Sequence, residues 1–145
     1  MEGGKDSDNR RDFPGGFPGD PQDAFSAQRT PAQGEVFDHV RALLHLRQQH
    51  PALRTGRLIH LFSDETGYAY VRESRPGGET PQAESLLLVM NNSGQPRTLT
   101  LDISGTAVEH AQALVPMLSA PAATLKGSQI TLSLPGCSLN IYEVQ

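Results

Sequence analysis

The stretch RTLTLDI at residues 97–103 decides the fold, because apolar and polar side chains alternate along it without a break. Leu99, Leu101 and Ile103 fall on one face of an extended strand, and the threonines and the aspartate fall on the other. The stretch QITLSL at residues 129–134 has the same alternation. One dry face and one wet face are typical of antiparallel strands that border a core. Both stretches therefore predict strands of a layered β-structure.

Turn-forming residues separate further segments that have the composition of short strands. These segments are 58–62, 68–72, 85–91, 112–118 and 138–144. The first two flank residues 63–67, whose length and final glycine suit a hairpin loop. With 97–103 and 129–134 they make seven short strands. This spacing predicts a mainly β protein with an antiparallel β-sandwich.

The clearest helix is predicted over about residues 31–50. Thr30 can cap this helix, Gln33 can complete a capping box, and a proline is favoured at the first helical position. The apolar residues of 36–46 recur at helical spacing and form a broad stripe that needs a partner surface. Pro51 is expected to end the helix, because the residue before a proline avoids the helical region.

Length, charge and cysteine content exclude several classes of protein. The 145 residues have a net charge of -4 and a pI near 5.7, so no basic surface is available to attract nucleic acid. No apolar run approaches the roughly 18 residues of a membrane span, so no membrane partner is predicted. Cys137 is the single cysteine, which rules out a disulfide framework and a cysteine-rich zinc site. The sequence predicts no cofactor.

Residues 1–30 are expected to form a long loop rich in glycine, proline and carboxylates. Its aspartates include Asp6, Asp8, Asp12, Asp20 and Asp23. Two of them could supply the acid and the base of glycoside hydrolysis, but turn formation is the favoured interpretation. Arg10 and Arg11 could bind sugar hydroxyls or pair with a loop aspartate. Its three phenylalanines predict an ordered loop with aromatic anchors, because a solvated linker usually lacks them.

The histidines and the cysteine have structural interpretations. His39 and His45 lie six residues apart on the helix and therefore do not form a chelating pair. His50, near the helix C-terminus, is expected to interact with the final carbonyls. Cys137 has no basic residue near it in the sequence and is expected to be a buried, inert thiol. No metal site is predicted.

Two short motifs each have two interpretations. Tyr68 and Tyr70 lie on the same face of their predicted strand and could form a platform for sugar stacking, although packing is the favoured interpretation. The residues Asn91-Asn92-Ser93 match a glycosylation sequon and are also an ordinary turn sequence.

The run DNRRDFPGGFPGD at residues 8–20 is similar to a segment of a known enzyme family. Together with the helix end LRQQHPAL at 46–53, it resembles the C-terminal part of α-amylase family enzymes (glycoside hydrolase family thirteen). The resemblance is greatest to the neopullulanase and cyclomaltodextrinase branch. In that branch such a segment follows the eighth strand of a (β/α)8 barrel, and one helix and an antiparallel sandwich complete the chain. The resemblance is strong over residues 8–56 and depends on the strand pattern thereafter.

This resemblance implies two domains and an incomplete enzyme. Residues 1–55 would be the remainder of a catalytic barrel, and residues 56–145 the C-terminal sandwich. Family members place their catalytic carboxylates upstream of the matching region, so this chain would carry no catalytic residue and be inactive alone. Asp6 and Arg10 fit an Asp-x-x-x-Arg pattern that touches sugar in related enzymes, which makes them the implied substrate-binding residues.

The implied parent enzyme hydrolyses α-glucosidic bonds in maltooligosaccharides, cyclodextrins or pullulan. In the parent, the apolar face of 36–46 would pack in the barrel. In the isolated chain this face would fold back on the sandwich, pair with a second copy or stay partly exposed. The alternative is a stand-alone carbohydrate-binding or accessory sandwich. Residues 1–30 contain no signal-peptide core, so the compartment stays open, with a periplasmic or secreted parent as one interpretation.

Overall fold

In the computed structural model the chain forms two compact units, residues 1–43 and residues 44–145. The structure describes residues 6, 14–15, 17–21, 23, 25, 29–77, 83–106, 108–118 and 120–145. None of the helices in these ranges is long and apolar enough to cross a membrane.

Helix α1 (Pro31–Gln49) begins with the predicted capping box. The backbone amide of Thr30 donates to Gln33 Oε1 at 2.9 Å, and the amide of Gln33 donates to Thr30 Oγ1 at 3.3 Å. These reciprocal bonds give partners to two amides that no helical carbonyl can reach. The structure confirms the predicted helix to within one residue at its C-terminus.

A second, short helix, α2 (Pro51–Thr55), follows α1 directly and was not predicted. His50 between them is extended, with φ -110° and ψ 102°. Pro51 therefore ends one helix and begins another, because proline is excluded from the interior of a helix but favoured at its first position. After α2 the chain passes so close to itself that a Cβ on Gly56 would lie 2.4 Å from the carbonyl oxygen of Ala52. Only glycine fits there.

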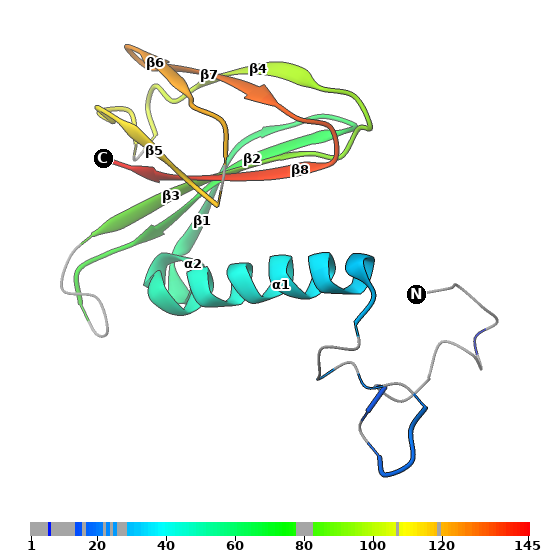
Figure 1. Cartoon of the computed structure of the whole chain (residues 1–145). Helices are drawn as coiled ribbons and strands as arrows, with labels where there is room; N and C mark the ends of the chain where they lie inside the picture. Colours follow the sequence, from blue (N-terminus) through cyan, green and yellow to red (C-terminus); the bar gives the residue numbers. More distant parts are fainter. Residues whose placement is uncertain are drawn as a thin grey trace. The chain divides into compact units, whose positions relative to one another are not determined.

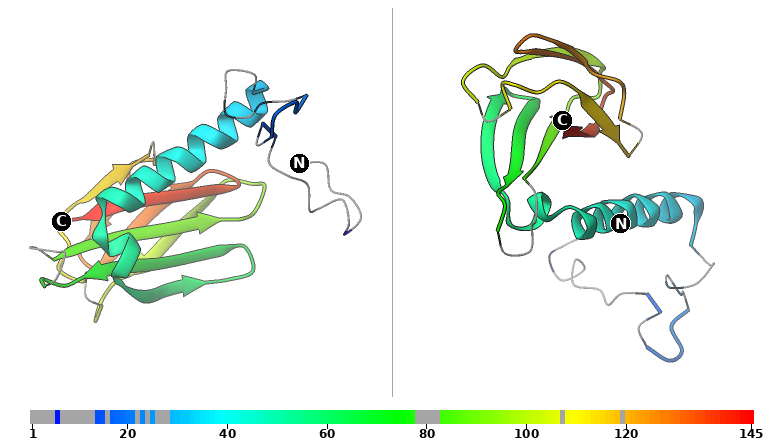
Figure 2. Two further views of the ribbon diagram at one scale, coloured as in Figure 1. Left: turned by 90° about the horizontal axis from the view of Figure 1, so that it is seen from below. Right: turned by 90° about the vertical axis from the view of Figure 1, so that its left-hand side faces the viewer.

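The rest of the second unit is a two-layer antiparallel sandwich (Figure 1). The larger sheet has the order β1-β2-β3-β8-β5 and the smaller sheet the order β4-β7-β6. The strands are β1 (Arg57–Ser63), β2 (Gly67–Ser74), β3 (Glu84–Asn91), β4 (Arg97–Asp102), β5 (Leu114–Met117), β6 (Thr124–Lys126), β7 (Gln129–Leu134) and β8 (Ser138–Val144). Figure 2 shows the two sheets as separate layers. The structure thus confirms the predicted sandwich.

All seven predicted strands are present, and the prediction missed only β6 among the strands that the structure describes. The ends of β7 and β8 lie where the sequence places them. Strand β6 has three residues and joins β7 through a turn in which Gly127 has φ +57°. Three residues are too few to display an alternation of period two, so β6 gives no signal in the sequence.

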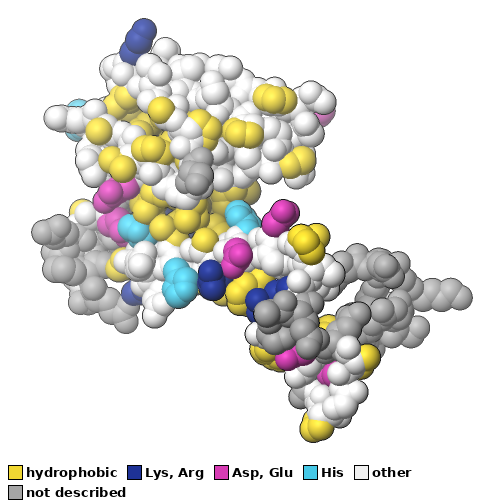
Figure 3. All heavy atoms as spheres, viewed as in Figure 1, with side chains coloured by type: hydrophobic (Ala, Val, Ile, Leu, Met, Phe, Trp, Pro, Cys, Tyr) yellow, Lys and Arg dark blue, Asp and Glu magenta, His cyan; other side chains and the backbone are white. Residues whose placement is uncertain are grey.

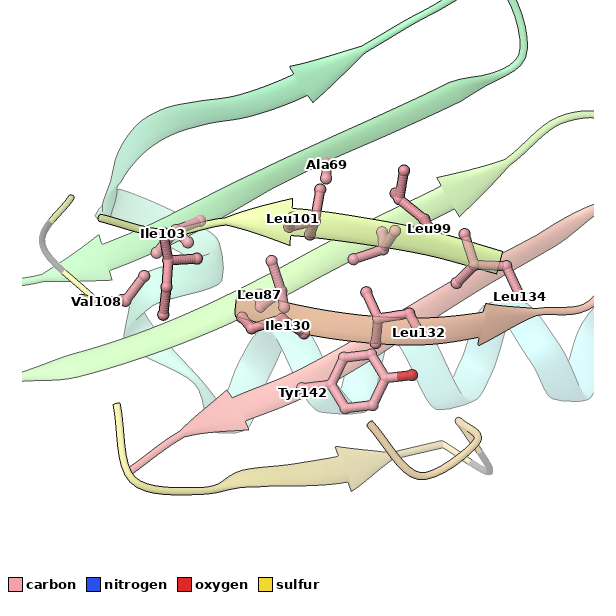
Figure 4. Packing of buried hydrophobic residues seen from close by; sticks show 12 residues of the cluster. Ala69, Leu87, Leu99, Leu101, Ile103, Val108, Ile130, Leu132, Leu134 and Tyr142 are labelled. Atoms are coloured by element: carbon pink, nitrogen blue, oxygen red, sulfur yellow. The ribbon is translucent and has the colours of Figure 1, made fainter. Parts of the chain in front are cut away.

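The core lies between the two sheets. The side chains that alternate along β4 and β7 point towards the larger sheet, where Ala69, Leu87 and Tyr142 face them (Figure 4). Leu132 is fully buried, and Leu101 is 2% exposed. Their neighbours Thr131 and Asp102 are exposed. The dry and wet faces predicted from the two alternating stretches are therefore correct.

Candidate functional site

The two residues implied to bind substrate are not brought together by the described part of the chain. Asp6 is exposed, and Arg10 lies outside the described residues. Arg11 and Asp12, which also entered the loop predictions, lie outside them too. The Asp6–Arg10 pair therefore stays a prediction from the family resemblance.

Two loop aspartates form turns, as favoured from the sequence. Asp20 Oδ2 accepts the backbone amides of Gly15 at 2.9 Å and Phe17 at 3.2 Å. Asp23 Oδ1 accepts the amide of Phe25 at 2.8 Å. These contacts are the local side-chain-to-backbone bonds for which aspartate is common in turns. A catalytic use of either carboxylate has no support from this geometry.

The expected aromatic anchors of the loop are largely exposed. Phe17 is 60% exposed and Phe25 is 67% exposed, while Phe13 lies outside the described residues. The exposure of these two rings gives no support to the predicted aromatic anchors. A turn built on aspartate side chains needs no aromatic packing to hold its backbone.

The two tyrosines of β2 form a row of rings with a histidine of β1. The rings of Tyr68 and Tyr70 have centroids 5.1 Å apart with 31° between their planes, and those of His60 and Tyr68 are 5.5 Å apart at 34°. Burial raises the pKa of the Tyr70 phenol. Figure 3 shows further hydrophobic side chains at the surface of the sandwich. The rings contact each other at distances typical of aromatic pairs, which fits packing and a stacking platform alike, so the favoured packing role stays a prediction.

The imidazole of His50 contacts a carboxylate of the sandwich. The sequence predicts a contact with the last carbonyls of the helix instead. The Nδ1 of His50 lies 2.5 Å from Glu84 Oε1, and the side chains are 18% and 19% exposed. The other oxygen of Glu84 accepts the amide of Ala52 at 2.9 Å. The Nε of Arg72 donates to the Ala52 carbonyl at 3.0 Å. Glu84 and Arg72 thus hold α2 on the strands β2 and β3.

An ion pair connects the two sheets at the opposite end of β2. Arg97 at the start of β4 donates two bonds to Asp64 in the β1–β2 loop, at 2.7 Å and 3.1 Å, and a third to Thr66 Oγ1 at 3.1 Å. The Asp64 carboxylate also accepts the amides of Thr66 and Gly67. The Arg97 guanidinium first, and these amides next, hold the pKa of the Asp64 carboxyl far below its usual range. The pair therefore stays charged at neutral and mildly acid pH.

We expect the stabilising effect of Asp64 to weaken in acid. A carboxyl whose pKa is lower in the folded chain stabilises the fold above its unfolded pKa of about 3.9, and this contribution fades as the pH falls below about 4. Urea unfolding of the wild type and of Asp64→Asn at pH 6 and pH 2.5 measures it. The difference in unfolding free energy between the two proteins should be smaller at pH 2.5.

The control for this prediction is Asp38→Asn, which makes the same change of charge at an exposed position of α1. Asp38 pairs with Arg41 at 3.1 Å, with both side chains more than half exposed. Exposed pairs one helical turn apart contribute little. An equal difference at both pH values for Asp64→Asn would contradict the role of the carboxylate.

Asn91 and Cys137 lie close together in the turns that end β3 and β7. Asn91 is 1% exposed, and its Oδ1 accepts a hydrogen bond from the amide of Ser93 at 3.1 Å. This bond to the residue two positions later makes a turn, so Asn91 has the turn role rather than the glycan-acceptor role. Cys137 is exposed, which contradicts the expected buried thiol. It follows Gly136 in the tight β7–β8 turn, where its φ is +48°.

The described ranges hold no group of three or more histidine, cysteine, aspartate or glutamate side chains that could bind a metal ion. His39 and His45 are exposed on α1, where the sequence places them.

Comparison with known proteins finds chains similar to this one in a cyclomaltodextrinase, an α-amylase and a debranching enzyme. No protein-family model matches this chain. A cyclomaltodextrinase of Geobacillus thermopakistaniensis (strain MAS1) is 25% identical over 111 residues, which are 77% of this chain and 17% of that protein. The structure of an α-amylase from Geobacillus thermoleovorans, complexed with acarbose, has a TM-score of 0.70 at 20% identity and covers 100% of this chain and 27% of that chain.

A debranching enzyme from Nostoc punctiforme is similar over a smaller part. Its structure has a TM-score of 0.56 at 26% identity and covers 77% of this chain and 22% of that chain. This chain therefore spans less than a third of each of these three proteins.

Proposed function

Since this chain matches the C-terminal region of α-amylase-family glycosidases, we propose that it serves as that region in an enzyme that hydrolyses α-glucosidic bonds. One observation carries the proposal: the Geobacillus thermoleovorans α-amylase covers all of this chain, whereas this chain covers only 27% of that enzyme. The substrates of such a parent would be maltooligosaccharides, cyclodextrins or pullulan. The chain itself would have a structural and accessory role.

The domain boundary that we propose lies between residues 55 and 56. Residues 1–55 would complete a catalytic barrel, and residues 56–145 would form the sandwich that supports it. This boundary follows from the family resemblance, and the bonds of Glu84 and Arg72 to α2 would then join the two domains across it.

The exposed apolar face of α1 supports the proposal that another element of the parent enzyme packs against this helix. Val36 is 65% exposed, Val40 is 47% exposed and Leu44 is 61% exposed, although all three lie on one stripe of the helix. In the parent this stripe would pack against the barrel, and in the isolated chain it would pair with the same stripe of a second copy.

We expect light scattering to give the isolated chain a mass above 15.7 kDa. The variant Val40→Lys should have the monomer mass, because it places a charge in the paired surface. A wild type that stays monomeric at high concentration would contradict the pairing.

The proposal is tested on the native gene product. An affinity tag is placed at the C-terminus of the reading frame in its own genome, and the tagged polypeptide is isolated and weighed. We expect a polypeptide several times the mass of this chain that releases reducing sugar from maltooligosaccharides, whereas the isolated chain releases none.

Asp6→Asn and Arg10→Met in that polypeptide should each raise KM for maltoheptaose about ten-fold, because each removes a hydrogen bond involving a charged group.

Two results would contradict the proposed function. One is a tagged product of only 15.7 kDa, and the other is reducing sugar released by the isolated chain. The stand-alone carbohydrate-binding sandwich would be favoured if a product of that small mass bound maltoheptaose and lost the binding when Tyr68 and Tyr70 were replaced by leucine.

A further inference from the structure

Four polar side chains meet where α2 lies on the larger sheet. Ser74 and Glu84 are opposite each other in the β2–β3 register, and Arg72 precedes Ser74 by two residues, so these three side chains share one face of the sheet. Helix α2 covers this face, because Glu84 accepts a hydrogen bond from the amide of Ala52 and Arg72 donates to the Ala52 carbonyl. His50, which directly precedes α2, supplies the fourth group.

The Glu84 carboxylate joins the sheet to the start of α2 with both of its oxygens. Oε1 lies 2.5 Å from Nδ1 of His50, and Oε2 accepts the bond from the Ala52 amide at 2.9 Å. The side chains of His50 and Glu84 are only 18% and 19% exposed, so water screens their contact weakly. A charged imidazolium makes a bond to a carboxylate that is about twice as strong as a bond between neutral groups. The hold on α2 therefore depends on the charge of His50.

Ser74 places an unused hydroxyl beside this carboxylate. The residue is 5% exposed, and its Oγ has no hydrogen-bond partner among the residues that the structure describes. Directly opposite residues of an antiparallel pair have Cβ atoms about 4.5–5.5 Å apart, so a rotation of the Glu84 side chain would bring its carboxylate within reach of this hydroxyl. A buried hydroxyl without a partner is unfavourable, and the new bond would remove that penalty. Glu84 thus has a second position available to it.

We propose that Glu84 is a two-position latch for α2, and that a charged His50 holds the latch closed. In the closed position the carboxylate bonds to His50 and to the Ala52 amide. When the pH rises and His50 becomes neutral, the carboxylate turns to the Ser74 hydroxyl and releases the start of α2. Because α2 ends the barrel remainder, the latch would also set how firmly the two domains of the parent are joined, a consequence that rests on the proposed function.

The other charged groups around Glu84 do not change their charge together with the latch. Arg72 on β2 and Arg54 on α2 are arginines, which stay charged throughout. Glu143 on β8 lies opposite Leu86, two residues along β3 from Glu84. Of the three types of side chain in this cluster, only histidine ordinarily gains or loses its charge between about pH 5 and pH 8. The closed latch is therefore expected at the lower end of this range and the open latch at the upper end.

The experiment is amide hydrogen exchange of the 145-residue chain, followed by NMR at about pH 5.5 and pH 8 and expressed as protection factors. The protection of the Ala52 amide reports opening of the latch, because this amide is bonded to Glu84. We expect this protection to fall about five-fold from the lower to the higher pH. His50→Gln, which stays neutral, should give the lower value at both.

Two further variants separate the latch from a purely structural contact. Ser74→Ala should raise the protection of the Ala52 amide about five-fold at both pH values, because it removes the bond that stabilises the open position. The matched control is His110→Gln. His110 lies 3.2 Å from Glu109 with its side chain 94% exposed, so its replacement should leave the protection of Ala52 unchanged at both pH values.

Three results would overturn the inference: equal protection of the Ala52 amide at both pH values in the wild type, a pH dependence that persists in His50→Gln, or protection in Ser74→Ala that is no higher than in the wild type. The test is independent of catalysis. A large, active tagged product together with pH-independent protection would overturn this inference alone. A pH-dependent latch in a chain whose tagged product is small and inactive would overturn the proposed function alone.

Discussion

Replacing Tyr142 by alanine is expected to lower the free energy of unfolding by about 3–5 kcal/mol, the largest effect of any single change proposed for this chain. Tyr142 is fully buried, and it lies on β8, an inner strand of the larger sheet. Its ring faces Leu132 across the core (Figure 4). Removing the ring leaves a cavity that packed sheets on both sides cannot fill. Urea unfolding followed by circular dichroism measures the loss.

The matched variant Tyr142→Phe separates the ring from its hydroxyl. The Tyr142 hydroxyl donates to the carbonyl of Pro121 at 2.9 Å and thereby ties the segment before β6 to β8. Losing this one bond should cost about 1 kcal/mol. A loss in Tyr142→Phe as large as that in Tyr142→Ala would contradict the role assigned to the ring.

The free energy of unfolding is also expected to fall at alkaline pH because of Tyr142. Burial raises the pKa of the Tyr142 phenol. The unfolded chain therefore releases this proton first, and stability falls as the pH rises above the unfolded pKa of about 10. Tyr142→Phe should lose stability less steeply than the wild type between pH 9 and pH 11. The Tyr70 phenol, whose pKa burial also raises, keeps part of the dependence in both proteins.

The sandwich could be predicted because its information is local. Strands β4 and β7 each face the core on one side only, so buried and exposed side chains alternate along their six residues. The capping box of α1 is equally local, since Thr30 and Gln33 are three residues apart. Helix α2 is not predicted, because five residues are too few to show a helical period. Pro51 is interpreted from the sequence only as the end of the first helix and not as the start of a second one.

The contacts that organise the candidate sites could not be predicted, since they join distant residues. Asp64 and Arg97 are 33 residues apart, and His50 and Glu84 are 34 residues apart. Either pairing requires the order of strands within the sheets, which the strand pattern does not contain. The pairing of Arg57 with Glu73 also lies beyond a simple count. Counting outward from the hairpin pair Ser63–Tyr68 would place Arg57 opposite Ser74, and the register shift between His60 and Phe62 brings Glu73 opposite instead.

The second large effect is expected for Asn91→Leu, which should lower the free energy of unfolding by about 2–3 kcal/mol. Asn91 fills all four hydrogen-bonding positions of its amide. Its Nδ2 donates to the carbonyls of Gln95 and Pro135, both at 2.9 Å, and its Oδ1 accepts from the amide and the hydroxyl of Ser93. One side chain thus connects the turn after β3 to the turn after β7. Leucine has the same number of side-chain heavy atoms, branched at the same position, and offers none of these bonds.

Two companion variants show whether the amide itself is responsible. Asn91→Asp keeps the acceptors for Ser93 but loses both donors and adds a charge beside two carbonyls, so it should be destabilised at least as much as Asn91→Leu at pH 7. Asn92→Leu changes the exposed next residue and should stay within about 0.5 kcal/mol of the wild type. If Asn91→Asp were as stable as the wild type, the donors to Gln95 and Pro135 would be dispensable. The link between the two turns would then depend on the backbone alone, through the amide of Cys137, which donates to the carbonyl of Ser93 at 2.8 Å.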